Sequence, residues 1–174
     1  MDAAGAVDDA SLDGLLAGLV DLGEGLAFNR HLGVEVASLA PGRCETVLPA
    51  DERLHNPLGG VHAIAELAPV ELAGALAVST RLAPLLTRGY VPVVGGLSVR
   101  YRAPAVGRLV ARAEVGEEVV APALAAADAG ERPRVEATVQ VTAEDGTVVA
   151  EADLRFVYLA MGEDPARGED RPAG

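Results

Sequence analysis

Two glutamates interrupt an otherwise apolar segment and are the first candidates for chemistry. From Ala63 to Val78 every residue is Ala, Ile, Leu, Val, Gly or Pro, except Glu66 and Glu71. A surface helix would carry a polar stripe at helical spacing, so this segment is predicted to be a buried helix. Burial raises the pKa of a carboxyl group. Glu71 could therefore act near neutral pH as a general base, or as a carboxylate nucleophile.

Glu66 competes with Glu71 for this role. Five residues correspond to about 140° around a helix, so the two side chains face different directions and cannot form a close carboxylate pair. One of them is then expected to have a structural or supporting role. Pro69 lies between them, and it should either kink the helix or mark its true start.

The loop before the helix could bind a carbonyl group. It runs Asn56-Pro57-Leu58-Gly59-Gly60, and Gly59 and Gly60 allow the backbone to approach a ligand closely. A helix beginning beyond His62 would present unpaired N–H groups, of which the Ala63 N–H is our candidate donor to an oxyanion. Asn56 could orient a water or a carbonyl. The alternative is an ordinary glycine turn in which Asn56 is a turn residue.

The residues and motifs that other reaction classes require are not found in this sequence. The chain has no Gly-x-Ser-x-Gly motif, no Walker-type loop and no dinucleotide fingerprint. All fourteen basic residues are arginine, which excludes Schiff-base chemistry on a lysine. His31, His55 and His62 lack metal-site spacing, and the single cysteine, Cys44, is expected to pack as a small apolar residue. We therefore expect no cofactor and no metal.

Composition points to one acidic domain. The chain has 174 residues and a net charge of −12, which argues against nucleic acid as a partner. No apolar run is long enough to span a membrane, and the acidic N-terminus lacks the basic start of a secretory signal. A cytoplasmic location without a membrane partner is the expectation.

A basic patch is the exception to this acidity. Residues 97–112 contain no acidic residue but four arginines, namely Arg100, Arg102, Arg108 and Arg112. In an acidic protein such a cluster is a candidate phosphate-binding surface. The alternative is a solvated strand face.

The remaining segments alternate in the manner of antiparallel strands with one covered face. Two strands are expected before the apolar helix, around residues 31–36 and 44–48, with a turn between them. Four follow it, at 91–102, 108–115, 134–144 and 147–158. A short helix is expected from Ser11 to about Leu22, ended by Gly23 and Gly25, and residues 117–133 are expected to be a loop or an irregular hairpin.

This order predicts an α+β fold in which a curled antiparallel sheet wraps one central apolar helix, a hot-dog-like arrangement. The hot-dog domain is expected to span residues 28–160. An acidic segment with the short helix precedes it (1–27), and a disordered tail follows (161–174). A second copy of the sheet would cover what remains exposed, so a dimer is expected.

The motif resembles that of the PaaI-like hot-dog acyl-CoA thioesterases. In that family an Asn is followed six residues later by a His, usually with Gly-Gly after it, and nine residues further by an Asp or Glu. Here Asn56, His62 and Glu71 keep both spacings. The segment Tyr101–Leu109 is similar to the family's Tyr-x-x-Pro-Ala-x-x-Gly-x-Leu pattern, and residues 31–34 also fit. Ala63-Ile64 replaces Gly-Gly, as in a branch carrying a His-Ala version.

The resemblance implies hydrolysis of an acyl-CoA thioester. Glu71 would be the base or nucleophile, the Ala63 N–H would polarise the carbonyl, and Asn56 would help to position carbonyl or water. In the family these groups meet across a homodimer interface, and dimers often pair into tetramers. Two other hypotheses are a non-catalytic acyl-CoA or lipid-binding module, and a thioesterase for acyl groups on a carrier protein, which the arginine patch could bind.

Overall fold

The computed structural model describes residues 9–162, and the tails at 1–8 and 163–174 lie outside the described residues. Six strands form one antiparallel sheet in the order β1-β2-β4-β5-β6-β3. Their bounds are β1 Glu35–Ala40, β2 Arg43–Leu48, β3 Tyr90–Tyr101, β4 Leu109–Glu114, β5 Arg134–Ala143 and β6 Val148–Ala160. The strands after the helix therefore lie where the alternation predicted them, and β1 and β3 form the two edges.

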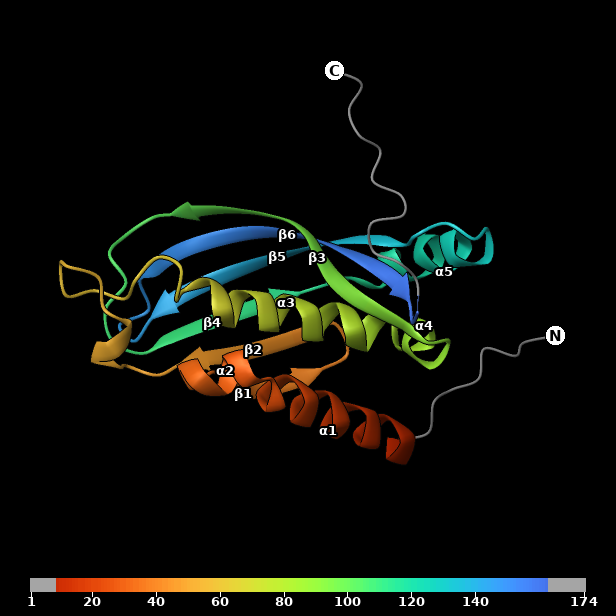
Figure 1. Ribbon diagram of the computed structural model, residues 1–174, viewed down its shortest axis with the longest axis horizontal. Helices are drawn as coiled ribbons and strands as arrows, with labels where there is room; N and C mark the ends of the chain where they lie inside the picture. The colour runs from red at the N-terminus through yellow and green to blue at the C-terminus, as the bar shows by residue number, and fades with distance from the viewer. Residues whose placement is uncertain (1–8, 163–174) are drawn as a thin grey trace, which may run out of the picture.

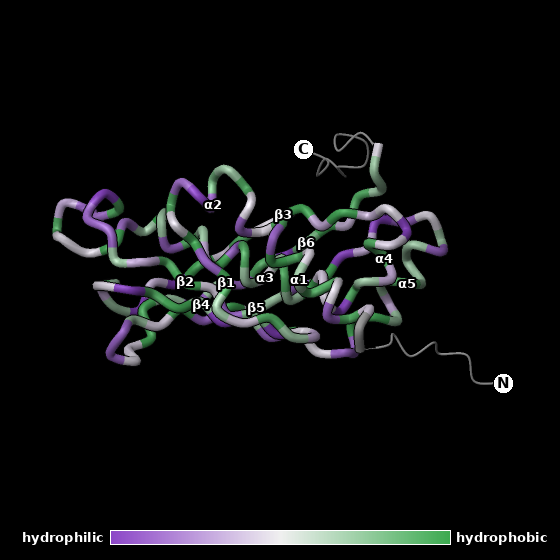
Figure 2. Tube along the Cα trace, turned by 90° about the horizontal axis from the view of Figure 1, so that it is seen from below, coloured by the Kyte–Doolittle hydropathy of each residue, from purple (hydrophilic) through white to green (hydrophobic). Residues whose placement is uncertain are grey.

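The central helix α3 (Leu67–Arg81) lies along the inner side of the curled sheet, as Figure 1 shows. The Thr46 hydroxyl of β2 donates a 2.7 Å hydrogen bond to the Pro69 carbonyl, and a Cβ added at Gly74 would touch the Phe156 ring of β6. Figure 2 shows many of the polar residues in the loops at the ends of the molecule. The fold is the predicted hot-dog arrangement.

The N-terminal region differs from the prediction. Helix α1 runs Asp9–Gly25, and a second helix, α2 (Ala27–Leu32), replaces the first half of the strand expected at 31–36. Gly33 has a φ of 72° and ends α2 as a left-handed cap, so it is not a strand residue. Gly23 does not end α1. A Cβ there would lie only 2.8 Å from a Leu72 methyl group, so this glycine lets α1 pack closely on α3.

Two short helices lie in connections between the main elements, one of them in the segment 117–133. Helix α4 (Ala83–Thr87) follows α3, and α5 (Val120–Asp128) follows a 3-10 turn at Glu117–Val119. The interpretation of 117–133 as a loop or hairpin was wrong, because the alanines there favour a helix. An ion pair of 2.7 Å between Arg88 and Asp128 joins the two regions. No helix within residues 9–162 has the length and apolarity needed to cross a membrane.

The β1–β2 turn is joined to the C-terminal end of α3 at Gly42. The Gly42 N–H donates a 2.8 Å hydrogen bond to the Thr80 hydroxyl, and a Cβ at this position would overlap the Arg81 side chain and the Val115 carbonyl oxygen. Gly146, in the β5–β6 turn, also has a positive φ (85° against 75° at Gly42), but a Cβ there would meet nothing within 4 Å. A substitution at Gly146 would therefore cause backbone strain alone, whereas one at Gly42 would cause both backbone strain and a steric overlap.

We expect Gly42→Ala to lower the free energy of unfolding by about 3 kcal/mol and Gly146→Ala by about 1 kcal/mol, because only the first adds a steric overlap to the backbone strain. Urea denaturation of both variants at one protein concentration measures the difference. Equal losses would show that the contact between the turn and α3 does not limit stability.

Candidate active site

The loop before α3 is held closed by the Asn56 side chain. Its Oδ1 accepts hydrogen bonds from the N–H groups of Leu58 (2.8 Å) and Gly60 (3.3 Å), and its Nδ2 donates to the Val61 carbonyl (3.1 Å). Gly59 has a φ of 81°. Gly60 allows a close approach, because a Cβ there would lie 2.8 Å from the Ala105 carbonyl oxygen. Asn56 and both glycines therefore shape the loop that leads to His62.

Helix α3 begins at Leu67, not directly after His62 as the sequence suggested. Pro69 is the third helical residue after the N-cap Glu66. A proline is tolerated there because the first N–H groups of a helix have no intrahelical acceptor, whereas deeper in a helix its ring would clash with the carbonyl four residues earlier. Pro69 therefore marks the start of α3, and the segment before it forms a separate turn.

Within this turn, residues 62–66, four of the five N–H groups are paired. The His62 N–H donates to Leu54, the Ile64 N–H donates to Nδ1 of His62 (3.1 Å), and the N–H groups of Ala65 and Glu66 both donate to the His62 carbonyl. The Ala63 N–H makes no hydrogen bond with any residue from 9 to 162. It is the free donor that an oxyanion site requires.

Glu66 is buried without compensation. The residue is only 4% exposed, and its carboxyl oxygen Oε2 has no hydrogen-bond partner within the described part of the chain. Burial raises the pKa of Glu66 to about 7. Burial raises the pKa of Tyr101 in β3, and the charge of Glu66 adds to this shift. Glu66 was expected to have a structural or supporting role, and Tyr101 was noted only as the first residue of the Tyr-x-x-Pro-Ala pattern, with no role assigned.

Glu71 lies on the one strip of α3 that the rest of the fold leaves open. It is half-buried, as are Leu67 and Ala75 one turn before and after it, whereas most other α3 residues are buried. Burial raises the pKa of Glu71. The carboxyl group can therefore reach a ligand from solvent while its environment favours proton uptake, which suits a general base.

An apolar side of the edge strand β3 is also uncovered. Val94, Leu97 and Tyr101 are 40%, 40% and 44% exposed, yet in the sheet they pair with the buried residues Phe156, Leu154 and Ala150. Paired residues share a face of the sheet, so these three side chains lie on the α3 side. Both β3 and the Glu71 strip of α3 therefore present partly uncovered surface on the inner side of the sheet.

The arginine patch is largely paired with carboxylates from neighbouring strands. Arg100 bonds to Asp153 (3.0 Å), Arg102 to Glu151 (2.9 Å) and Arg112 to Glu45 (2.7 Å). Arg108 is exposed and forms no ion pair within residues 9–162. These acids come from β2 and β6, far away in the sequence, which is why residues 97–112 looked uniformly basic.

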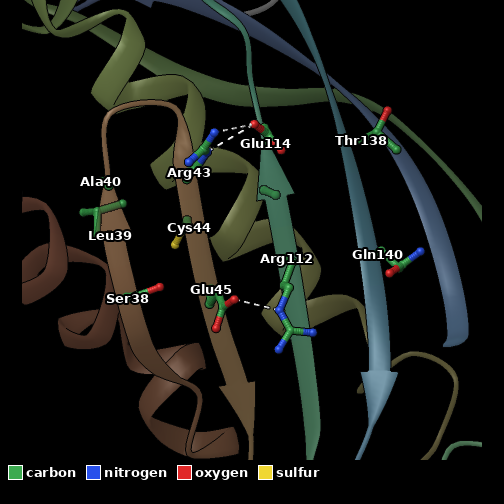
Figure 3. Close-up of a pocket in the computed structure, with 11 residues that line it drawn as sticks. Ser38, Leu39, Ala40, Arg43, Cys44, Glu45, Arg112, Glu114, Thr138 and Gln140 are labelled. Atoms are coloured by element: carbon green, nitrogen blue, oxygen red, sulfur yellow. Dashed lines mark hydrogen bonds and ion pairs between the residues drawn. The ribbon is translucent and has the colours of Figure 1, made fainter. Parts of the chain in front are cut away.

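The outer face of the sheet carries a shallow depression of about 520 Å³, shown in Figure 3. It is on the side away from α3, because Glu45 alternates along β2 with Thr46, which bonds to α3. Its charged residues form cross-strand pairs, Arg43 with Glu114 (3.1 Å) and Arg112 with Glu45. The depression is therefore separate from Glu71 and Ala63. In residues 9–162 no group of three His, Cys, Asp or Glu side chains is arranged to hold a metal ion.

The buried carboxyl of Glu66 makes stability depend on pH. Its pKa in the folded protein (about 7) is above its ordinary value of 4.5, so the folded state binds this proton more tightly than the unfolded chain does. Loss of this proton therefore lowers the free energy of unfolding. The loss of stability is absent below pH 4.5, grows as the pH rises to about 7 and is constant above that.

We therefore compare the free energy of unfolding of Glu66→Gln with that of the wild type at about pH 5 and pH 8. The difference in favour of Glu66→Gln should be larger at about pH 8 than at about pH 5, by roughly 1–3 kcal/mol. Urea denaturation at both pH values measures this gain, with the exposed Glu52→Gln as the matched control. A difference between Glu66→Gln and wild type that is the same at both pH values would contradict the assignment.

Comparison with known proteins supports the architecture. Among solved structures, a probable thioesterase of unknown function from Pseudomonas aeruginosa is 24% identical with a TM-score of 0.71, over 82% of this chain and 93% of that chain. A thioesterase family protein from Silicibacter pomeroyi is 22% identical with a TM-score of 0.67, over 83% and 98%. The PaaI protein of the phenylacetic acid degradation operon of E. coli is 14% identical with a TM-score of 0.64, over 86% and 94%. At these identities the likeness establishes the fold.

A search of curated proteins found no match to this sequence. A family model described as a domain of unknown function, DUF4442, matches residues 25–158. This range includes the 62–66 turn, α3 and all six strands except the last two residues of β6. The chain therefore belongs to the DUF4442 family and has the hot-dog fold.

Proposed function

We propose that the protein is a thioesterase that hydrolyses an acyl-CoA thioester. The observation that carries this proposal is the unpaired Ala63 N–H, the one free donor in a turn whose other N–H groups are all bonded within the described chain. This turn leads directly into the helix that carries the half-buried Glu71. The printed names of the similar structures, which are thioesterases or probable thioesterases, support the same reaction class.

In the proposed mechanism, the Ala63 N–H hydrogen-bonds to the thioester carbonyl and strengthens that bond as negative charge develops on the oxygen. Acting as a general base, Glu71 removes a proton from water, and the resulting hydroxide adds to the carbonyl carbon. The C–S bond then breaks as Glu71 returns this proton to the sulfur, which releases a thiol and a carboxylic acid. Acting instead as a nucleophile, Glu71 would form an anhydride that water then hydrolyses. The raised pKa of Glu71 strengthens its carboxylate as a base.

The remaining candidate residues have indirect roles in this proposal. Asn56, Gly59 and Gly60 hold the loop, and His62 holds the turn by accepting a hydrogen bond from Ile64. Arg108 is the best candidate for the CoA phosphates because it alone of the four patch arginines lacks an ion pair among the described residues. The pairing of Arg100 and Arg102 disfavours an acidic carrier protein, which would need a broad basic surface.

A homodimer formed along β3 is part of the proposal. β3 is an edge strand with unpaired backbone groups, and its side toward α3 exposes Val94 and Leu97. A second copy pairing there would cover this apolar surface and bring residues of the partner close to Glu71. We propose that this contact completes the substrate site, and that pairs of dimers could follow.

We expect Glu71→Gln to lower the rate of thioester hydrolysis by at least about 100-fold while acyl-CoA still binds, because the amide cannot accept a proton or attack the carbonyl. Release of free thiol from a panel of acyl-CoAs measures the rate, and calorimetry measures binding. Glu136→Gln, on the exposed side of β5, is the control.

Equal activity of Glu71→Gln and wild type would remove Glu71 from the mechanism. Saturable binding of acyl-CoA by a wild-type protein that releases no thiol would instead identify a non-catalytic binding module, and the proposed reaction would be wrong.

We expect Leu97→Glu to convert the dimer to a monomer, because it places a charge on the apolar side of the proposed interface. Sedimentation at micromolar concentration measures the change. Leu22→Glu, which adds the same charge to an exposed position of α1, should leave the dimer intact. A wild-type protein that is monomeric under these conditions would refute the interface.

A further inference from the structure

We propose that Tyr101 is a positioning residue that fixes the orientation of the Ala63 N–H. The Tyr101 hydroxyl donates a 2.8 Å hydrogen bond to the Ala63 carbonyl oxygen, 38 residues away in the sequence. This contact connects the end of β3 to the turn at residues 62–66. The inference rests on the proposed function, in which Ala63 donates to the thioester carbonyl.

The geometry explains how this single hydroxyl can affect the orientation of the Ala63 N–H. The Ala63 N–H lies in the peptide plane that it shares with the His62 carbonyl, and this plane is joined at the Ala63 Cα to the next plane, which contains the Ala63 carbonyl and the Ile64 N–H. The plane before it is fixed through the His62 carbonyl, which accepts two hydrogen bonds, from Ala65 (2.8 Å) and Glu66 (3.2 Å). The plane after it is fixed through the Ala63 carbonyl by Tyr101 and through the Ile64 N–H by the His62 ring. Removing the hydroxyl would leave this second plane held at one end only, and the φ torsion of Ala63, which joins the two planes, would be less restricted.

The choice of acceptor by Tyr101 supports this role. Glu66 follows Ala63 by three residues, and a phenol beside a carboxylate would normally donate to the charged oxygen. Tyr101 donates instead to the neutral carbonyl of Ala63, and Oε2 of Glu66 accepts no hydrogen bond. The Tyr101 hydroxyl therefore binds the turn and not the Glu66 carboxyl group.

The test compares Tyr101→Phe with Tyr90→Phe. Both residues belong to β3 and both substitutions remove one hydroxyl, but the Tyr90 hydroxyl makes no hydrogen bond with any residue of the described part of the chain. We expect Tyr101→Phe to lower kcat about tenfold with less than a twofold change in KM, because the hydrogen bond acts on the transition state rather than on binding. Tyr90→Phe should match the wild type.

Two NMR measurements test the same contact without turnover. In Tyr101→Phe the carbonyl carbon signal of Ala63 should move upfield and the Ile64 N–H should exchange faster with solvent, while Tyr90→Phe leaves both unchanged. If these signals change in a protein that hydrolyses no thioester, the positioning contact stands and the proposed reaction fails. If the wild type is active and Tyr101→Phe keeps its kcat, or if neither signal changes, the positioning role is overturned.

Discussion

Burial of α3 inside the curled sheet is the constraint on which the rest of the structure depends. A helix that is apolar on almost every side must be covered, and the sheet, with α1 added along one side, covers all of it except the strip that carries Glu71. The same burial sets the chemistry of both glutamates, because it raises their pKa values. Fold and candidate site therefore have one physical cause.

The start of this helix decides where a free donor appears. Pro69 is disfavoured deeper than the first turn of α3, so the five residues before Leu67 form their own turn. The hydrogen bonds of this turn leave the Ala63 N–H without an acceptor among residues 9–162. The donor that we assign is thus not a helix-terminal N–H in the strict sense. Its peptide plane is held by the two hydrogen bonds that the His62 carbonyl accepts, and we propose that Tyr101 holds the plane that follows it.

Much of this could be predicted from the sequence, because strand alternation and the apolarity of residues 63–78 are local signals. What was missed depended on contacts between distant segments. Gly23 looked like a helix end and is a packing contact with α3, and Gly33 is a helix cap within an apparent strand. The acids that neutralise Arg100 and Arg102 lie about fifty residues further along the chain. The contact between Tyr101 and Ala63 joins residues 38 positions apart in the sequence, and only the fold brings them together.

The most direct test of the account is a structure of the protein with a non-hydrolysable acyl-CoA analogue in which a methylene group separates the carbonyl from sulfur. The account predicts the analogue's carbonyl oxygen within about 3 Å of the Ala63 nitrogen, with the Glu71 carboxyl beside the carbonyl carbon or separated from it by one water. An analogue bound in the outer depression of the sheet, or one whose carbonyl points away from Ala63, would contradict it.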